Sequence, residues 1–318
     1  MASEVVMLNV DRWYRGAVLG VAGRPQVERL LRTRGWGLAK RFVAGETLPE
    51  AIAAVRRLEA DGILGILDLL GEMVADATAA QAFTERILEI FPALAEASLS
   101  GYVSIKLSQI GQDLPGPGGE PLALSNARRI LQKARETSAF VCIDMEDCPR
   151  VERTLEQFRQ LHAEFGEQVG LVLQSYLRRS EDDQRALLPL HPTLRIVKGA
   201  YSESPEVAYP EKWKVDAAYL RMVYRQLAAG LPVAVATHDP RILRSVLDYA
   251  QRNAVPRELL EFQMLYGVRS DLQRQLAAQG QRVRAYIPFG PDWYAYFSRR
   301  IAERPANVAF VLRGLFQS

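Results

Sequence analysis

The sequence predicts an α/β fold, a (β/α)8 barrel of the TIM type, and two observations predict it. Short apolar runs rich in β-branched residues alternate with amphipathic segments over most of the chain, which is typical of a parallel sheet covered by helices. Eight such runs can be counted, and eight strand–helix units favour closure into a barrel over an open doubly wound sheet. The chain has 318 residues, of which 48% are hydrophobic and 24% charged, so one large buried core is expected.

Residues 1–61 are expected to form an amino-terminal helical segment packed on the barrel, and residues 62–318 the catalytic barrel itself. Thr47 and Glu50 have the spacing of a capping box, which predicts a helix that begins there and ends near Gly62. The predicted strands are 62–70, 102–108, 139–144, 169–175, 194–199, 231–237, 260–266 and 282–288. The predicted helices are 79–97, 124–137, 150–165, 212–229, 240–253 and 269–279, and a further helix follows the eighth strand over 292–303.

Charge, cysteine content and hydropathy limit the compartment and the partners. No apolar run approaches the roughly 20 residues that span a bilayer, and the first residues lack the layout of a secretory signal. Two cysteines cannot form a disulfide framework or a four-thiolate zinc site, so a cytoplasmic protein is expected. Residues 1–41 are basic, which favours a solvated helix face; contact with an anionic membrane surface is the alternative. No motif for binding nucleic acid is present.

Charged residues recur at the ends of the predicted strands, where the active sites of β/α barrels lie. Lys106 and Asp144 end neighbouring strands. Because a buried lysine without a carboxylate partner is very costly, we expect these two side chains to form an ion pair. In the last helix Arg299 and Arg300 are adjacent, and Tyr296 lies on a similar face. Guanidinium groups are preferred partners of carboxylates, so a small carboxylate with an apolar body would fit.

Several chemistries are compatible with these residues. The chain has three histidines, and of these His238 alone ends a predicted strand. A metal site built from several histidines is therefore excluded. Magnesium on Asp144, Glu146 and Asp147 is a weak alternative.

A Schiff-base aldolase would use Lys106 or Lys198 as its amine nucleophile. A redox barrel would hold a flavin or a nicotinamide with its polar strand ends. Its cofactor site would not be of the Rossmann type, because no GxGxxG motif follows a predicted strand. A barrel without catalytic activity that binds membrane or nucleic acid is the alternative from another class.

Six motifs occur in an order that is specific as a set. They are SIKLSQIG at Lys106, IDMED at Asp144, LVLQSY at Gln174, RIVKGAY at Tyr201, ATHD at His238, and AYFSRRIAERPANV at Arg299 and Arg300. Together they resemble the proline dehydrogenase family over about residues 62–312. The resemblance implies a distorted (β/α)8 barrel with non-covalent FAD at its carboxyl end and a carboxyl-terminal helix over the barrel mouth.

The resemblance also implies roles by position. Arg299 and Arg300 would bind the carboxylate of L-proline. The substrate pocket would be lined by Lys106, Asp144, Tyr286 and Tyr296, with Tyr201 near both substrate and flavin. The residues that would contact FAD are Met145, Gln174, Arg195, Val197, Gly199, Ala200, Thr237 and His238. Glu303 would support the arginines or the ring. Where some members have a tryptophan after the tyrosine of KGAY, this sequence has Ser202.

The implied reaction is hydride transfer to FAD from the ring carbon beside proline's nitrogen, which gives Δ1-pyrroline-5-carboxylate. Electrons would pass on to a membrane quinone, which gives the basic amino-terminal region a purpose in peripheral contact with the inner face of the cell membrane. The chain lacks the aldehyde dehydrogenase domain of bifunctional relatives. A monofunctional enzyme that supplies a separate pyrroline-5-carboxylate dehydrogenase is therefore expected.

Overall fold

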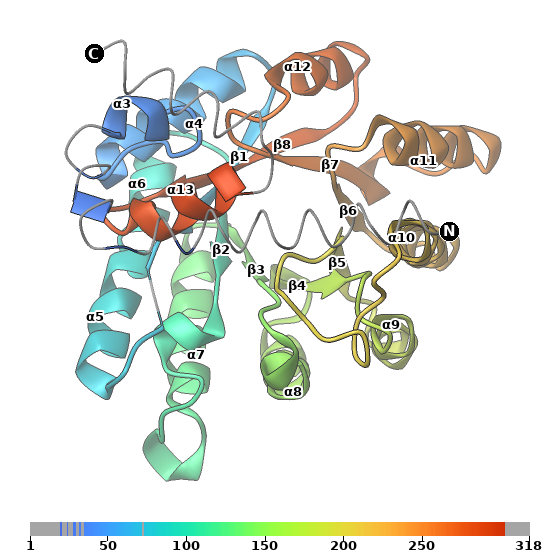
Figure 1. Cartoon of the computed structure of the whole chain (residues 1–318). Coiled ribbons are helices and arrows are strands. Elements are labelled where there is room, and N and C mark those ends of the chain that lie inside the picture. Colours follow the sequence, from blue (N-terminus) through green and yellow to red (C-terminus); the bar gives the residue numbers. More distant parts are fainter. Residues whose placement is uncertain are drawn as a thin grey trace.

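A closed barrel of eight parallel strands forms the centre of the molecule (Figure 1). The computed structural model describes residues 35–71 and 73–302, together with Gly20, Arg24, Glu28, Arg29 and Arg32. Each strand pairs with the next along the chain, and β8 pairs with β1, for example Leu64 with Arg284. The predicted (β/α)8 barrel is confirmed.

The strands follow the predicted order and agree closely with the predicted ranges. They are β1 (Leu64–Leu69), β2 (Tyr102–Ile105), β3 (Phe140–Ile143), β4 (Val169–Gln174), β5 (Thr193–Val197), β6 (Val233–Ala236), β7 (Leu260–Leu265) and β8 (Val283–Phe289). All six residues of β4 are buried, as expected for a parallel strand with helices on one face and the barrel interior on the other. The largest difference is at β2, which was predicted to end at residue 108: it ends at Ile105, and the 3-10 helix η1 (Leu107–Ile110) begins just after Lys106.

Helices follow the strands and surround the barrel. They are α3 (Trp36–Ala39), α4 (Leu48–Ala60), α5 (Ala77–Leu88), α6 (Ile90–Glu96), α7 (Leu122–Glu136), α8 (Cys148–Phe165), α9 (Ser180–Leu187), α10 (Lys212–Ala228), α11 (Pro240–Arg252), α12 (Ser270–Ala278) and α13 (Trp293–Ala302). The predicted helix 79–97 is two helices, because Pro92 cannot donate a hydrogen bond to the Leu88 carbonyl. The sequence prediction missed α9, a short helix with an acidic first turn.

The helices at the two ends of the described chain pack on the carboxyl ends of the barrel strands. The capping box is confirmed, since the Glu50 carboxylate accepts a hydrogen bond from the Thr47 amide at 3.1 Å. The rings of Trp36 in α3 and Trp293 in α13 lie 5.2 Å apart, in an apolar cluster that includes Leu70 after β1. The predicted amino-terminal helical segment contains α3 and α4 within residues 35–61. Most of residues 1–34 lies outside the described residues.

None of the helices in the described part of the chain combines the length and the apolar character that crossing a bilayer requires. The Pro/Gly-rich loop between η1 and α7 is on the side of the strands' carboxyl ends, as expected, because it joins a strand to the following helix. It is closed by backbone hydrogen bonds, including one from the Leu122 amide to the Leu114 carbonyl at 2.9 Å.

Candidate functional site

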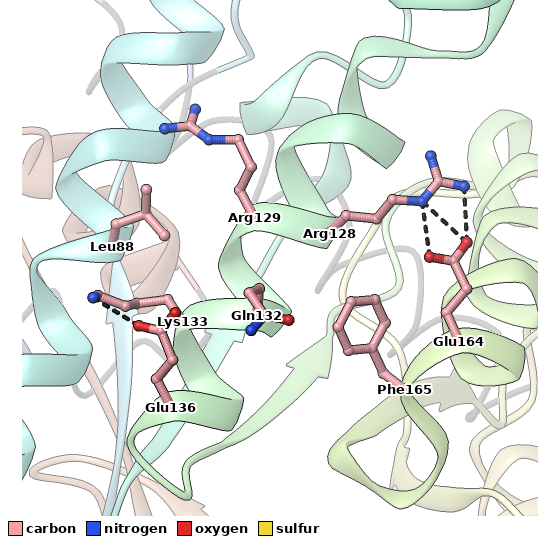
Figure 2. A pocket seen from close by; sticks show the side chains of 8 residues that line it. All are labelled: Leu88, Arg128, Arg129, Gln132, Lys133, Glu136, Glu164 and Phe165. Atoms are coloured by element: carbon pink, nitrogen blue, oxygen red, sulfur yellow. Dashed lines mark hydrogen bonds and ion pairs between the residues drawn. The ribbon is translucent and has the colours of Figure 1, made fainter.

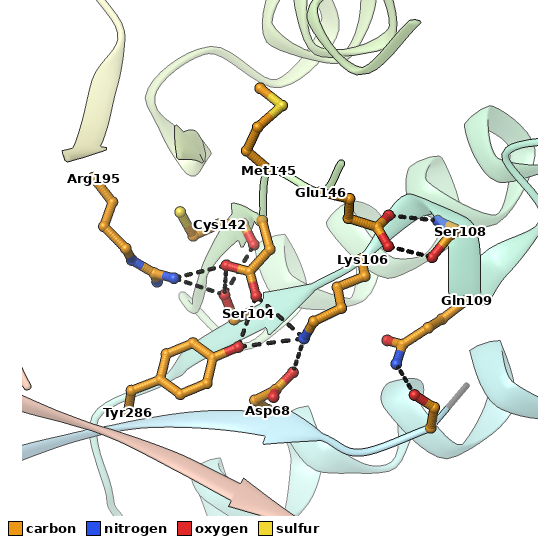
Figure 3. A network of polar contacts seen from close by, with 12 residues as sticks. Asp68, Ser104, Lys106, Ser108, Gln109, Cys142, Met145, Glu146, Arg195 and Tyr286 are labelled. Carbon is orange, nitrogen blue, oxygen red and sulfur yellow. Dashed lines mark hydrogen bonds and ion pairs between the residues drawn. The ribbon is translucent and has the colours of Figure 1, made fainter. Parts of the chain in front are cut away.

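A buried network of charges occupies the mouth of the barrel, where β1, β2, β3 and β8 end (Figure 3). Lys106 Nζ donates to Asp68 Oδ1 at 2.7 Å and lies 3.3 Å from Asp144 Oδ2. It also lies 3.4 Å from the hydroxyl of Tyr286. The expected ion pair between Lys106 and Asp144 is therefore present, and Asp68 is a second carboxylate on the same ammonium group.

Asp144 is the centre of this network. One carboxylate oxygen, Oδ1, accepts hydrogen bonds from Arg195 and from the Ser104 hydroxyl, both at 2.8 Å. The other, Oδ2, accepts from the Tyr286 hydroxyl at 2.7 Å. Burial raises the pKa of Asp144, but the charges of Lys106 and Arg195 and these hydrogen bonds lower it below its usual value. Asp144 is therefore held as a carboxylate beneath the open part of the barrel mouth.

The two lysines at the strand ends are each bound by two carboxylates. Burial lowers the pKa of Lys106, but the charges of Asp68 and Asp144 more than offset this and raise it above its ordinary value. Lys198 Nζ is 2.6 Å from Asp216 and 3.1 Å from Asp239. A Schiff-base nucleophile must be a neutral amine, so this geometry argues against the aldolase alternative.

The three carboxylates of the magnesium alternative have separate partners. Asp144 is bound by the cations just described. Glu146 accepts a hydrogen bond from the Ser108 hydroxyl at 2.5 Å, and Asp147 pairs with Arg150 at 2.8 Å. No cluster of three potential metal ligands exists among the residues that the structure describes.

Arg195 connects the network to the other half of the barrel. Its guanidinium group is only 4% exposed and lies between the rings of Tyr102 and Tyr286, at 5.6 Å and 5.4 Å from their centroids. Its Nη1 binds Asp144, whereas its Nε is buried and has no hydrogen-bond partner within the described chain. Buried donors without partners are rare in proteins, so this N–H is available to a water or ligand atom.

Apart from Glu303, the predicted cofactor residues lie in or just after β3, β4, β5 and β6. Gln174 donates to the Met145 carbonyl at 3.0 Å, which leaves its buried Oε1 without a partner among the described residues. Gly199 has a φ of +118°, and a Cβ there would lie 2.2 Å from the Tyr176 ring, so a side chain cannot be accommodated. His238 accepts from the Leu265 amide at 2.9 Å through Nε2, which fixes its imidazole.

The other predicted cofactor residues share this half of the mouth. Val197 ends β5, Ala200 follows it, and Thr237 follows β6, where its hydroxyl accepts from the Asp239 amide at 3.2 Å. An unpaired buried donor on Arg195 and an unpaired buried acceptor on Gln174 together fit the polar ring of a flavin, whose edge offers both kinds of hydrogen-bonding atom.

α13 brings the two predicted carboxylate-binding arginines to the mouth. The Arg300 guanidinium lies 5.2 Å from the centroid of the Tyr296 ring, four residues earlier. The pKa of the Tyr201 phenol is raised to about 12, mainly by burial. The positive charges of Lys106 and Arg299 act in the opposite direction and lower it. Arg299 and Lys106 thus act on the same tyrosine from α13 and from the end of β2. Glu303 lies outside the described residues.

Comparisons with known proteins show the family to which the chain belongs. The model of the family described as proline dehydrogenase matches residues 51–313. The chain belongs to the proline dehydrogenase family. A proline dehydrogenase of Deinococcus radiodurans is 53% identical over 309 residues, which cover 97% of this chain and 99% of that protein. Proline dehydrogenase 1 of Bacillus subtilis is 44% identical and covers 88% of this chain and 91% of its own.

Solved structures of proline dehydrogenase domains have the same fold. A crystal structure of proline utilization A (PutA) from Bdellovibrio bacteriovorus, inactivated by N-propargylglycine, has a TM-score of 0.80 and 25% identity. The match covers 92% of this chain and 36% of that one, so this chain spans about a third of the length of that protein. The resemblance inferred from the ordered motifs is therefore confirmed.

A groove on the outer surface lies away from the barrel mouth (Figure 2). Its residues include the last turns of α5, α7 and α8, which lie at the end of the barrel opposite to the mouth. Its cations are already paired, Arg128 with Glu164 at 2.8 Å and Lys133 with Glu136 at 2.9 Å. The charged network of Figure 3, not this groove, is therefore the candidate site.

Sequence reasoning missed two members of the network. Asp68 is the nearest carboxylate to Lys106, and Ser104 binds both Asp144 and Arg195. A signal for Asp68 was present, because a charged residue interrupts the apolar strand β1. Arg195 was predicted as a cofactor contact, and its ion pair with Asp144 was not foreseen.

Proposed function

We propose that this chain oxidises L-proline to Δ1-pyrroline-5-carboxylate with non-covalent FAD as hydride acceptor, and that a quinone takes the electrons. As a member of the proline dehydrogenase family it is an oxidoreductase that acts on proline. The observation that supports the finer statement is the ionised Asp144, fixed by Lys106, Arg195 and Tyr286 beside the unpaired Arg195 Nε–H.

The substrate residues have separate tasks in this proposal. Arg299 and Arg300 bind the carboxylate of proline from α13, since guanidinium groups pair well with carboxylates. Hydride departure leaves positive charge on the ring nitrogen, and a fixed anion such as Asp144 lowers the energy of that state. Tyr286 and Lys106 keep Asp144 oriented, the buried Tyr296 excludes water from the mouth, and Tyr201 lies near substrate and flavin.

FAD would be held by the residues at the ends of β3 to β6. Gln174 Oε1 and Arg195 Nε are the buried atoms that would pair with the ring, and Gly199, which packs against the Tyr176 ring, would contribute its backbone. Met145, Val197, Ala200, Thr237 and His238 complete the predicted contact set, and Glu303 is proposed to support it. The group supplies, when bound, the two-electron acceptor that no amino-acid side chain provides.

The proposed partners follow from the products. Electrons leave to a membrane quinone, and Δ1-pyrroline-5-carboxylate passes to a separate pyrroline-5-carboxylate dehydrogenase. Relatives from Escherichia coli and Klebsiella aerogenes are named bifunctional protein PutA, and this chain covers about a quarter of each. We place the enzyme in the cytoplasm, with the basic residues 1–41 in peripheral contact with the inner face of the membrane.

The first test is the visible absorbance spectrum of the purified protein before and after anaerobic addition of L-proline. A flavin spectrum that bleaches with proline, and does not bleach with D-proline at the same concentration, is the expected result. A flavin that stays oxidised would remove proline as the substrate. Protein that neither contains nor can be reconstituted with a flavin would overturn the cofactor assignment.

Replacing Tyr296 with leucine is expected to raise the KM for proline by roughly 2- to 30-fold, because Arg300 loses the aromatic ring beneath it, an interaction of about 0.5–2 kcal/mol. Steady-state kinetics on the flavin-loaded enzyme measure this. Tyr294→Leu is the matched control, since Tyr294 lies in the same helix, is also buried, and has Arg32 over its ring at 5.3 Å. An equal change of KM in both variants would exclude a specific role for Tyr296.

A further inference from the structure

The reaction requires a proton acceptor that the roles above do not supply. The ring nitrogen of proline is protonated at neutral pH, and it must lose a proton before hydride can leave the neighbouring carbon. Asp144 is poorly suited to this task. Its two oxygens already accept hydrogen bonds from Arg195, Ser104 and Tyr286, and its pKa is lowered. This inference rests on the proposed function.

Asp68 differs from Asp144 in its surroundings. Its side chain, in β1, is 3% exposed, and its Oδ1 accepts a hydrogen bond from Lys106 at 2.7 Å. The titratable groups that face it are Lys106 after β2, Asp144 after β3 and Tyr286 on β8. Burial raises the pKa of Asp68 above its usual value, and the nearby charge of Asp144 raises it further, against the effect of Lys106. Of the two carboxylates, Asp68 is the one that binds a proton more readily.

Lys106 lies between Asp68 and the open mouth. Its side chain is 22% exposed, against 3% for Asp68, so a substrate in the mouth reaches the ammonium group before it reaches the carboxylate. The lysine has three N–H bonds, of which one points at Asp68 Oδ1 and another at the Tyr286 hydroxyl. A pair of carboxylates whose environments separate their pKa values is a common basis for dividing acid and base roles in an active site.

We propose that Asp68 is the acceptor of the substrate's amine proton and that Lys106 relays it. Lys106 first gives a proton to Asp68: an N–H bond of Lys106 breaks, an O–H bond forms on Asp68 Oδ1, and the electron pair stays on Lys106 Nζ. An N–H bond of the substrate ammonium then breaks, and its proton forms a new N–H bond with that electron pair. Lys106 keeps three protons and its charge, Asp68 becomes neutral, and the electron pair stays on the substrate nitrogen. Nothing is oxidised or reduced in this step. Asp144 remains an anion for the positive charge that develops afterwards.

Asp68→Asn tests the relay, because asparagine keeps the shape of the side chain and cannot take up the proton. The expected result is a loss in kcat/KM for proline of about 100- to 10,000-fold near neutral pH, the usual size of a general-base effect. The loss should shrink as pH rises, since more of the substrate is then already deprotonated in solution. A loss that is constant from neutral to alkaline pH would overturn the relay, because a purely structural defect has no such dependence.

Glu261→Gln is the matched control. Glu261 is a buried carboxylate in β7 that pairs with Arg284 at 2.9 Å and with Arg282 at 2.8 Å. Its replacement also removes one negative charge from a buried ion pair, without touching Lys106. If the pH profile of kcat/KM of Glu261→Gln has the wild-type shape, the result supports the proposal. If Glu261→Gln loses kcat/KM and the loss shrinks as pH rises, as expected for Asp68→Asn, the result contradicts the proposal.

Two measurements besides turnover separate the relay from the proposed function. Tetrahydrofuran-2-carboxylate has the ring and carboxylate of proline and no amine proton. Equal affinity of wild type and Asp68→Asn for it is expected, and failure of the wild type to bind it would count against the proline site itself.

Infrared difference spectra of the wild-type holoenzyme on anaerobic addition of proline should show a new protonated carboxyl band. Its absence in the wild type overturns the relay even if Asp68→Asn does not fold.

Discussion

Replacing Asp144 with asparagine is expected to lower kcat for proline by about 100- to 1,000-fold, the usual effect of removing one group that stabilises transition-state charge. The amide keeps the shape of the side chain and loses the negative charge that faces the developing positive charge on the substrate nitrogen. Lys106, Arg195 and Tyr286 would then surround a neutral group. Single-turnover reduction by proline measures the effect on the chemical step. A rate within threefold of wild type would exclude Asp144 from the reaction.

The same substitution should destabilise the fold by about 3–5 kcal/mol, since removal of one partner leaves buried cations uncompensated. Arg195 is the main cause, because its side chain is only 4% exposed and has its ion pair with Asp144. Unfolding in urea measures the free energy. Glu136→Gln is the control: that carboxylate pairs with Lys133 at 2.9 Å on α7, and the two side chains are 50% and 40% exposed. We expect it to cost at most about 1 kcal/mol.

The barrel could be predicted because its signal is local. A strand buried on both faces is a continuous apolar run, and β4 and β6 are visible in the sequence for that reason alone. The break between α5 and α6 was also readable, because Pro92 stands where an uninterrupted helix needs a backbone donor. α9 could not be predicted, because its eight residues are mostly polar and its short buried face gives no clear helical period of hydrophobic residues.

Only those contacts of the site that join consecutive strands could be predicted from the sequence. Lys106 and Asp144 end consecutive strands, and consecutive parallel strands are neighbours in a barrel. The contact of Arg195 with Asp144 joins β5 to the end of β3 across the barrel interior, and that of Asp68 with Lys106 depends on which of two carboxylates is nearer. Both are decided by the tilt and closure of the barrel, which no local pattern in the sequence encodes.

Replacing Arg299 with methionine is expected to weaken proline binding by about 2–4 kcal/mol, because the substrate carboxylate loses a charged partner. This corresponds to roughly a 30- to 700-fold increase in Kd. Methionine keeps the unbranched stem of the side chain and removes its charge, and Arg299 lies on α13, outside the strand ends whose residues we assign to FAD. Flavin content should therefore be unchanged, which the absorbance spectrum of the purified variant measures.

Titration of the oxidised enzyme with tetrahydrofuran-2-carboxylate gives the affinity of the carboxylate site without turnover. Arg274→Met is the matched control, since Arg274 is an exposed arginine on α12 that lies 3.7 Å from Asp61 and belongs to no part of the mouth. The expected result is a large loss of affinity in Arg299→Met and none in Arg274→Met. Because Arg299 also lowers the pKa of Tyr201, the variant should shift the Tyr201 titration further to alkaline pH. Unchanged affinity together with an unchanged tyrosine titration would place Arg299 outside the site.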